Sequence, residues 1–108
     1  MFARFLELTI KPEKKPDLIK ALKNDVLPIV KECNGFFEMI PLDVETEPTK
    51  FYLMSLWHEK RDAEQFHRDN FPKVQAIYDP FLTAPINVKL CHVDETVTTK
   101  KFVVAAAA

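Results

Sequence analysis

Apolar and polar residues alternate over residues 2–10 (FARFLELTI), a pattern typical of a strand with one buried face. Over residues 17–33 the apolar positions recur every three or four residues, which predicts an amphipathic helix. Because Pro28 inside this run has no backbone N–H, we expect a kink or short break near residues 25–27. Gly35, the only glycine of the chain, follows and predicts a left-handed cap that ends the helix.

The second half of the chain predicts two strands, a broken helix and a last strand. Residues 36–42 and 51–57 are apolar runs joined by the polar segment DVETEPTK, which indicates a hairpin. A helix is expected to begin near Arg61 and to be interrupted before Pro72, which suits the first turn of a new helical stretch. A final strand is expected over residues 86–93.

The order of these elements is β-α-β-β-α-β. It predicts an α+β, ferredoxin-like fold, in which a four-stranded antiparallel sheet carries both helices on one face. A chain of 108 residues fits one domain, which we assign to residues 1–95. Residues 96–108 are then a C-terminal tail that could contact a partner subunit.

The strand expected at residues 51–57 has no polar face. One side carries Phe51, Leu53, Ser55 and Trp57, and the other carries Tyr52, Met54, Leu56 and His58. Because helices cover only one face of such a sheet, an uncovered apolar face would favour aggregation. We therefore expect a second copy of the chain to cover it, as a homodimer that packs sheet against sheet. The alternative is that KFVV, at residues 101–104, folds back over this face.

The composition of the chain limits the classes of binding partner that we expect. The chain has 15 basic and 16 acidic residues and a net charge of −1, so nothing in it predicts binding to nucleic acid or to an anionic membrane. No run of about 18–20 apolar residues could span a bilayer, and the first residues do not resemble a signal peptide. Cys33 and Cys91 form no CxxC and no metal-ligand set, which favours two buried thiols in a reducing cytoplasm.

One long run, NGFFEMIPLDVETEPTKFYLMSLWHEKRDAEQFHRDNF, resembles the antibiotic biosynthesis monooxygenase (ABM) domain, a dimeric α-β barrel. The matching features are Gly35, Asp43, Pro48, Trp57, Ala63 and His67. The segment LTIKPEKKPDLIKAL is also similar to the family's first strand and the loop after it, so the resemblance covers about residues 3–93. The family includes cofactor-free quinol and anthrone monooxygenases, haem-degrading proteins, isomerase-like members and proteins without known activity.

A pocket between sheet and helices is the expected site. On the helix after Arg61, positions three and four apart share one side, namely Ala63, Phe66, His67, Asn70 and Phe71. We expect this side of the helix to face the inner side of the sheet, which predicts an apolar small-molecule pocket between them. The expected substrate-binding residues are Leu6, Phe51, Phe66, Asn70, Phe71 and Tyr78. A packed core would use the same residues, so a purely structural interpretation stays open.

The resemblance implies roles for two residues. In a cofactor-independent monooxygenase that oxidises a quinol- or anthrone-like aromatic with O₂, His67 could take the substrate proton. The indole N–H of Trp57, with Asn70 or Tyr52, could stabilise the developing oxyanion. In the structural alternative Trp57 is core, and His67 bonds to a backbone carbonyl or a carboxylate. Two further histidines are expected to be structural or interfacial: His58 and His92.

Two other functions remain open at this point. The haem-degrading relatives carry a Trp and, ten residues later, a haem-ligating His, a spacing that Trp57 and His67 match. Those relatives also have an Asn in the first strand, where this chain has Leu6, and no Asn occurs before Asn24. The departure weakens haem degradation and leaves haem binding open. The third interpretation is a non-catalytic dimeric binding protein for a small apolar ligand, with neither cofactor nor metal.

Overall fold

The computed structural model describes residues 1–97 of the chain. The tail segment at residues 101–104, which we considered as a cover for the sheet, lies outside these residues. Among those described, no helix is both long enough and apolar enough to cross a membrane.

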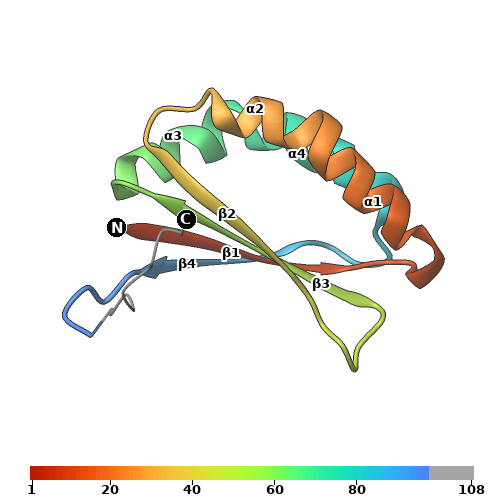
Figure 1. Cartoon of the computed structure of the whole chain (residues 1–108). Coiled ribbons are helices and arrows are strands. Elements are labelled where there is room, and N and C mark those ends of the chain that lie inside the picture. Colours follow the sequence, from red (N-terminus) through yellow and green to blue (C-terminus); the bar gives the residue numbers. More distant parts are fainter. Residues whose placement is uncertain (98–108) are drawn as a thin grey trace, which may run out of the picture.

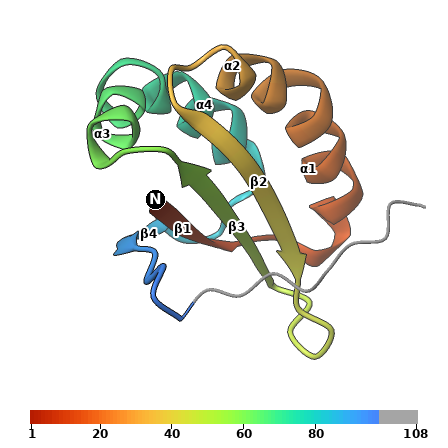
Figure 2. The same ribbon diagram turned by 60° about the vertical axis from the view of Figure 1, so that its left-hand side comes forward.

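The described chain forms one antiparallel four-stranded sheet in the order β2-β3-β1-β4, with all helices on one face (Figures 1 and 2). The strands are β1 (Phe2–Thr9), β2 (Phe36–Asp43), β3 (Lys50–Trp57) and β4 (Asn87–His92). The main helices are α1 (Lys15–Ala21), α2 (Leu27–Lys31), α3 (Lys60–Asp69) and α4 (Phe71–Tyr78). The short turns are η1 (Pro12–Lys14), η2 (Leu22–Val26) and η3 (Asp79–Phe81). The predicted βαββαβ order and ferredoxin-like fold are confirmed.

The predicted break in the first helix is also confirmed. A π-helical turn, η2, separates α1 from α2 just before Pro28. In this turn the N–H of Leu27 bonds to the carbonyl of Leu22, five residues earlier. The wider turn fits the missing N–H of Pro28, which leaves the carbonyl four residues before it without a helical donor.

Gly35 adopts the predicted left-handed conformation, with φ of 76°, although α2 already ends at Lys31. Gly35 therefore lies in the turn that leads into β2 and is not the helix cap we expected. A Cβ at this position would collide with the carboxylate of Asp62, and the Gly35 carbonyl accepts a 2.8 Å hydrogen bond from the His58 N–H. Because Asp62 also belongs to the capping box of α3 with Glu59, the turn and the start of α3 hold each other in place.

The faces of β3 alternate as predicted, but those of β2 do not. In β3 the residues on the helix side are buried, and those on the other side are half-buried. In β2 a bulge between Phe36 and Glu38 shifts the register, so Phe36 and Met39 both pack against the core. Strict alternation along a strand would place these two residues on opposite faces, but the extra residue, Phe37, reverses the alternation.

The sheet face away from the helices carries a row of apolar side chains: Ala3, Phe5, Ile40, Leu42, Tyr52, Met54, Leu56 and Cys91. Phe5 and Tyr52 stack here with ring centroids 5.3 Å apart. Cys91 is exposed and Cys33 is half-buried, so the expectation of two buried thiols was wrong for Cys91. Cys91 lies on an edge strand, where β4 has a neighbour on one side only.

Candidate functional site: a buried arginine between the core and an open groove

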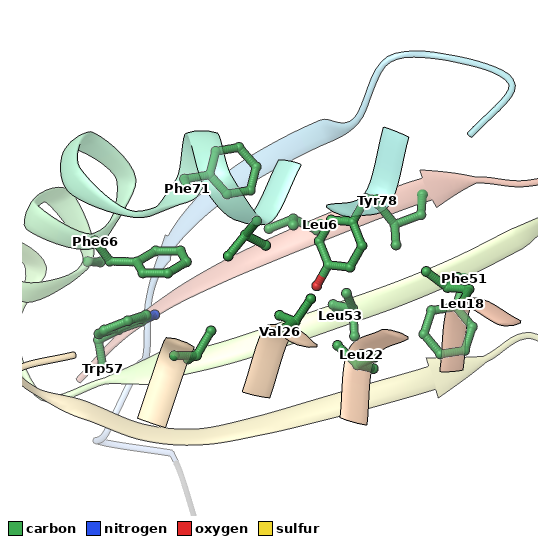
Figure 3. Packing of buried hydrophobic residues seen from close by; sticks show 14 of the residues in the cluster. Leu6, Leu18, Leu22, Val26, Phe51, Leu53, Trp57, Phe66, Phe71 and Tyr78 are labelled. Atoms are coloured by element: carbon green, nitrogen blue, oxygen red, sulfur yellow. The ribbon is translucent and has the colours of Figure 1, made fainter. Parts of the chain in front are cut away.

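Trp57 lies in the aromatic part of the core, at the end of β3. It is completely buried, and the ring of Phe66 lies beside it at a centroid distance of 5.0 Å (Figure 3). The ring of Phe36 packs edge-on against it at 5.5 Å. The indole Nε1–H donates to Ser55 Oγ at 3.0 Å, on the same face of the same strand. The N–H that we expected to face a substrate therefore has a partner within the protein.

A cavity does lie between sheet and helices, but side chains nearly fill it. Its volume is about 10 Å³, room for about one water molecule. Its walls are Arg4, Leu6, Val26, Val30, Met39, Leu53, Ser55, Trp57, Phe66, Phe71, Val74 and Tyr78. Figure 3 shows the Tyr78 hydroxyl pointing inward, toward Val26 and Leu53. An aromatic ligand could enter here only if the core opened.

Most of the expected pocket residues meet around this central cavity, and two do not. Leu6, Phe66, Phe71 and Tyr78 line it together with Trp57. Phe51 is a buried core residue that also lines a separate surface groove beside α1, η2 and β2. Asn70 lines a polar surface pocket, where its side-chain amide lies 3.5 Å from Cys33 Sγ.

Arg4, on β1, is the charged residue at the centre of the site. It is 2% exposed, and its guanidinium carbon lies 4.9 Å from the ring centre of Phe66 and 4.5 Å from that of Phe71. Among residues 1–97 no carboxylate forms an ion pair with it, and its Nε has no hydrogen-bond partner. Burial lowers the pKa of Arg4 to about 10, and proximity to Tyr78 only partly opposes this shift. A buried cation without a counter-ion is unusual and calls for a functional explanation.

Sequence reasoning overlooked Arg4, although a signal was present. The alternation that places Leu6 and Leu8 on the inner face of β1 also places Phe2 and Arg4 there. A charged residue in phase with the buried side of a strand is the signal that would have identified it.

His67 lies on α3 beside Arg4. Its Nδ1 is 3.2 Å from an Arg4 Nη2, and its ring stacks on Phe71 at 5.3 Å with an interplanar angle of 21°. Because a guanidinium can only donate, Nδ1 accepts this hydrogen bond and Nε2 carries the proton of the neutral ring. Partial burial and then the charge of Arg4 lower the pKa of His67, which keeps it neutral at neutral pH.

The space next to this pair is an open groove between α3 and β4, which we call the α3–β4 groove. Its volume is about 560 Å³, within the range of small-molecule sites. Its lining residues are Phe2, Arg4, Ala63, Glu64, His67, Arg68, Val88 and Leu90. His67 and Trp57 thus line different spaces, while Arg4 lines both. The structure separates the two residues that we expected to share one pocket.

The remaining polar candidates lie elsewhere. Tyr52 is on the open sheet face, where its hydroxyl is 3.3 Å from Glu7 Oε2. His58 packs edge-on against Phe37 at 5.4 Å, and His92 against Phe2 at 5.1 Å. Among residues 1–97 there is no cluster of three or more His, Cys, Asp or Glu side chains that could hold a metal ion.

Comparison with known proteins places the fold. No protein-family model and no curated protein matches the sequence. Among solved structures, the monooxygenase from the ActVA-Orf6 gene of Streptomyces coelicolor, in complex with nanaomycin D, is similar with a TM-score of 0.69 and 15% identity. The match covers 97% of this chain and 92% of that one.

Two further structures give the same result. A protein of unknown function from Nitrosomonas europaea has a TM-score of 0.71 and 19% identity, over 95% of both chains. A structure named antibiotic biosynthesis monooxygenase has a TM-score of 0.68 and 13% identity, over 86% of this chain and 98% of its own. The chain therefore has the fold of the antibiotic biosynthesis monooxygenases, as the resemblance predicted. Identities this low establish the fold and not the reaction.

Proposed function

We propose that this protein is a cofactor-independent monooxygenase that oxidises a quinol- or anthrone-like aromatic with O₂ in the α3–β4 groove. The observation that carries the proposal is the Arg4–His67 pair, in which a neutral imidazole and a buried cation meet at the wall of a largely apolar groove. Similar structures named as monooxygenases, one of them with nanaomycin D bound, support the choice of reaction class.

The chemistry needs an acidic hydroxyl on an electron-rich ring. The substrate transfers this proton to His67 Nδ1, and the resulting anion gives one electron to O₂. The two radicals combine and His67 returns its proton, which gives a hydroperoxide at a ring carbon that still bears one hydrogen. Loss of water then leaves a carbonyl, so that one oxygen atom stays on the product and the other leaves with two substrate hydrogens. The protein has to supply a proton acceptor, a dry wall and charge stabilisation.

The geometry assigns the proton transfer to one nitrogen. In the neutral ring the lone pair of His67 lies on Nδ1, where Arg4 donates to it at 3.2 Å. A substrate hydroxyl would have to take the place of Arg4 in this hydrogen bond, donating to Nδ1 while its oxygen accepts from the guanidinium. The proton would then move away from an oxygen that faces a positive charge, which favours ionisation.

Trp57 could stabilise a substrate oxyanion, as predicted, only after its indole N–H leaves Ser55. For its N–H to reach a substrate oxygen, the ligand would have to displace Ser55 Oγ and enter the central cavity. In the groove reaction Trp57 instead supports Phe66, the ring that lies beneath Arg4.

Haem binding is the second candidate, favoured by the exposed position of His67 and by its Nε2, the ring nitrogen that Arg4 does not engage. The residues of the central cavity do not fit a haem, because the space they enclose is about 10 Å³. A haem ligated by His67 would therefore have to lie in the groove. A haemin titration monitored at the Soret band, with His67→Ala beside the native protein, separates this candidate from the first. A sharp band lost in the variant would favour haem.

Oxygen uptake with dithranol and a panel of reduced quinols tests the proposed reaction. His67→Ala should lower kcat/KM by about a hundredfold or more, the usual contribution of a general base. His58→Ala removes a histidine outside the groove and should leave the rate unchanged. No uptake above buffer with any substrate, or equal rates in both variants, would leave the chain as a binding protein of the same fold.

We also propose that a second copy of the chain covers the open sheet face. The face combines Phe5, Ile40, Tyr52, Met54 and Leu56 around the middle of the sheet, an apolar patch that single domains seldom leave uncovered. Sedimentation should give a dimer at micromolar concentration for the native chain and a monomer for Met54→Lys. Lys73→Glu, on the exposed side of α4, is the control with unchanged mass. A monomeric native protein would contradict the proposal.

A further inference from the structure

No carboxylate among residues 1–97 forms an ion pair with Arg4, and Arg4 lines the α3–β4 groove, from which an anion could reach it. The side chain is 2% exposed and lines the groove, yet one of its N–H groups, at Nε, has no acceptor. Within the part of the chain that the structure describes, its side chain has one hydrogen-bond partner, the neutral Nδ1 of His67. Phenyl rings lie against its carbon at 4.9 and 4.5 Å and compensate the charge only in part.

The other charged groups around the groove do not neutralise Arg4. Glu64 and Arg68 line the same groove from α3, and both are exposed. Arg68 lies 3.6 Å from the Asp69 carboxylate and so points to a partner on its own helix. Tyr78, on the core side, has its pKa raised by burial and is neutral at ordinary pH. The wall that contains Arg4 and His67 is thus positively charged.

We propose that Arg4 is an anion-binding subsite, and that the groove takes a flat aromatic molecule with one planar oxyanion, a carboxylate or an ionised phenol or enol. The guanidinium offers a fork of N–H donors that matches such oxygens. The aromatic body would lie against the apolar part of the groove, which is formed by Phe2, Ala63, Val88 and Leu90. The inference rests on the proposed function only for the position of the ligand, since binding needs no oxygen chemistry.

A matched ligand pair tests the subsite. Calorimetric titration with 2-naphthoate and 2-naphthamide compares one ring system with and without the charge. The native protein should bind the acid at least about tenfold more tightly, the usual effect of hydrogen bonds to a charged group. Equal affinities, or no binding of either compound, would overturn the proposal.

Two arginine variants locate the effect. Arg4→Met keeps a long apolar side chain in the core and should abolish the preference for naphthoate. Arg61→Met removes an exposed cation of α3 that does not line the groove and should keep it. A preference that survives in Arg4→Met would overturn the assignment. Far-ultraviolet circular dichroism and a urea transition establish that both variants are folded, and Arg4→Lys, which keeps the charge without the fork, should bind with intermediate preference.

A titration with 4-nitrophenol tests whether the subsite binds phenolates or only carboxylates, because the absorption of this compound reports its ionisation. If Arg4 holds phenolates, the bound compound should be ionised at a pH where the free compound is not, and this shift should vanish in Arg4→Met. If only naphthoate shows the Arg4-dependent preference, the subsite is one for carboxylates. Failure of oxygen uptake together with Arg4-dependent binding would remove the proposed reaction and leave the subsite intact.

Discussion

The two spaces on either side of Arg4 differ in whether they have room for a ligand. Around Trp57 the aromatic rings close on each other and leave about 10 Å³. Around His67 the same sheet and the same helix leave about 560 Å³ open to solvent. The sequence pattern is apolar in both regions, so hydrophobic periodicity alone cannot tell a filled core from a groove.

The difference arises from where the helices lie over the sheet. Helix α3 packs over β1 and β3, while β4 lies at the edge of the sheet, next to β1. Leu90 shows this directly: it is on the helix side of β4, opposite Arg4 in register, and is still 59% exposed. An edge strand that no helix fully covers provides the wall of a groove, whereas a central strand provides the floor of a core.

Removing Trp57 should give the largest effect on stability. Trp57→Ala empties a fully buried site and is expected to lower the free energy of unfolding by about 3–5 kcal/mol. Leu90→Ala, in the groove, should change it by less than about 0.5 kcal/mol. Urea unfolding measures both. Similar losses in the two variants would contradict the distinction between core and groove.

Removing the charge of Arg4 should instead raise the free energy of unfolding. The lowered pKa, from 12.5 to about 10, corresponds to about 3 kcal/mol of unfavourable burial of the charge, at every pH below about 10. Loss of the contacts with Phe66 and Phe71 offsets part of this. Arg4→Met is therefore expected to raise the free energy of unfolding by about 1–2 kcal/mol.

The native protein with saturating 2-naphthoate is the comparison for this variant. Ligand should stabilise the native protein more than Arg4→Met, since only the native chain has a charge to neutralise. An Arg4→Met protein that is less stable than the native chain would identify Arg4 as a structural residue.

Much of the fold followed from the sequence. The βαββαβ order, the break before Pro28 and the faces of β3 depend on local periodicity and on single breakers, which are readable from the sequence. The bulge at Phe37 was not, because one extra residue in a ladder leaves no trace in composition.

The site was predicted less well than the fold. Helical spacing placed Phe66 and Phe71 correctly on the inner side of α3 and α4, and both meet Trp57 around the central cavity. The spacing could not show that His67, one position after Phe66, would reach outward to the groove. Nor could it pair His67 with Arg4, 63 residues earlier, since a contact between β1 and α3 depends on packing and not on local pattern.

The smallest effect expected is on the pKa of His67. It tests whether the charge of Arg4, which lines both core and groove, acts on the histidine in the groove. Burial first, and then Arg4, lower the pKa of His67, so the folded state binds fewer protons than the unfolded state. The contribution of His67 to the free energy of unfolding is fully present above its ordinary pKa of about 6.5. It is lost as the pH falls through the lower pKa of the folded state. In Arg4→Met the charge disappears while most of the burial remains, so the pKa of His67 should rise only part of the way. Following the imidazole proton shifts by NMR in both proteins measures this. An unchanged pKa would mean that the 3.2 Å contact carries no charge interaction in solution, and that the charge of Arg4 does not hold His67 neutral beside the groove.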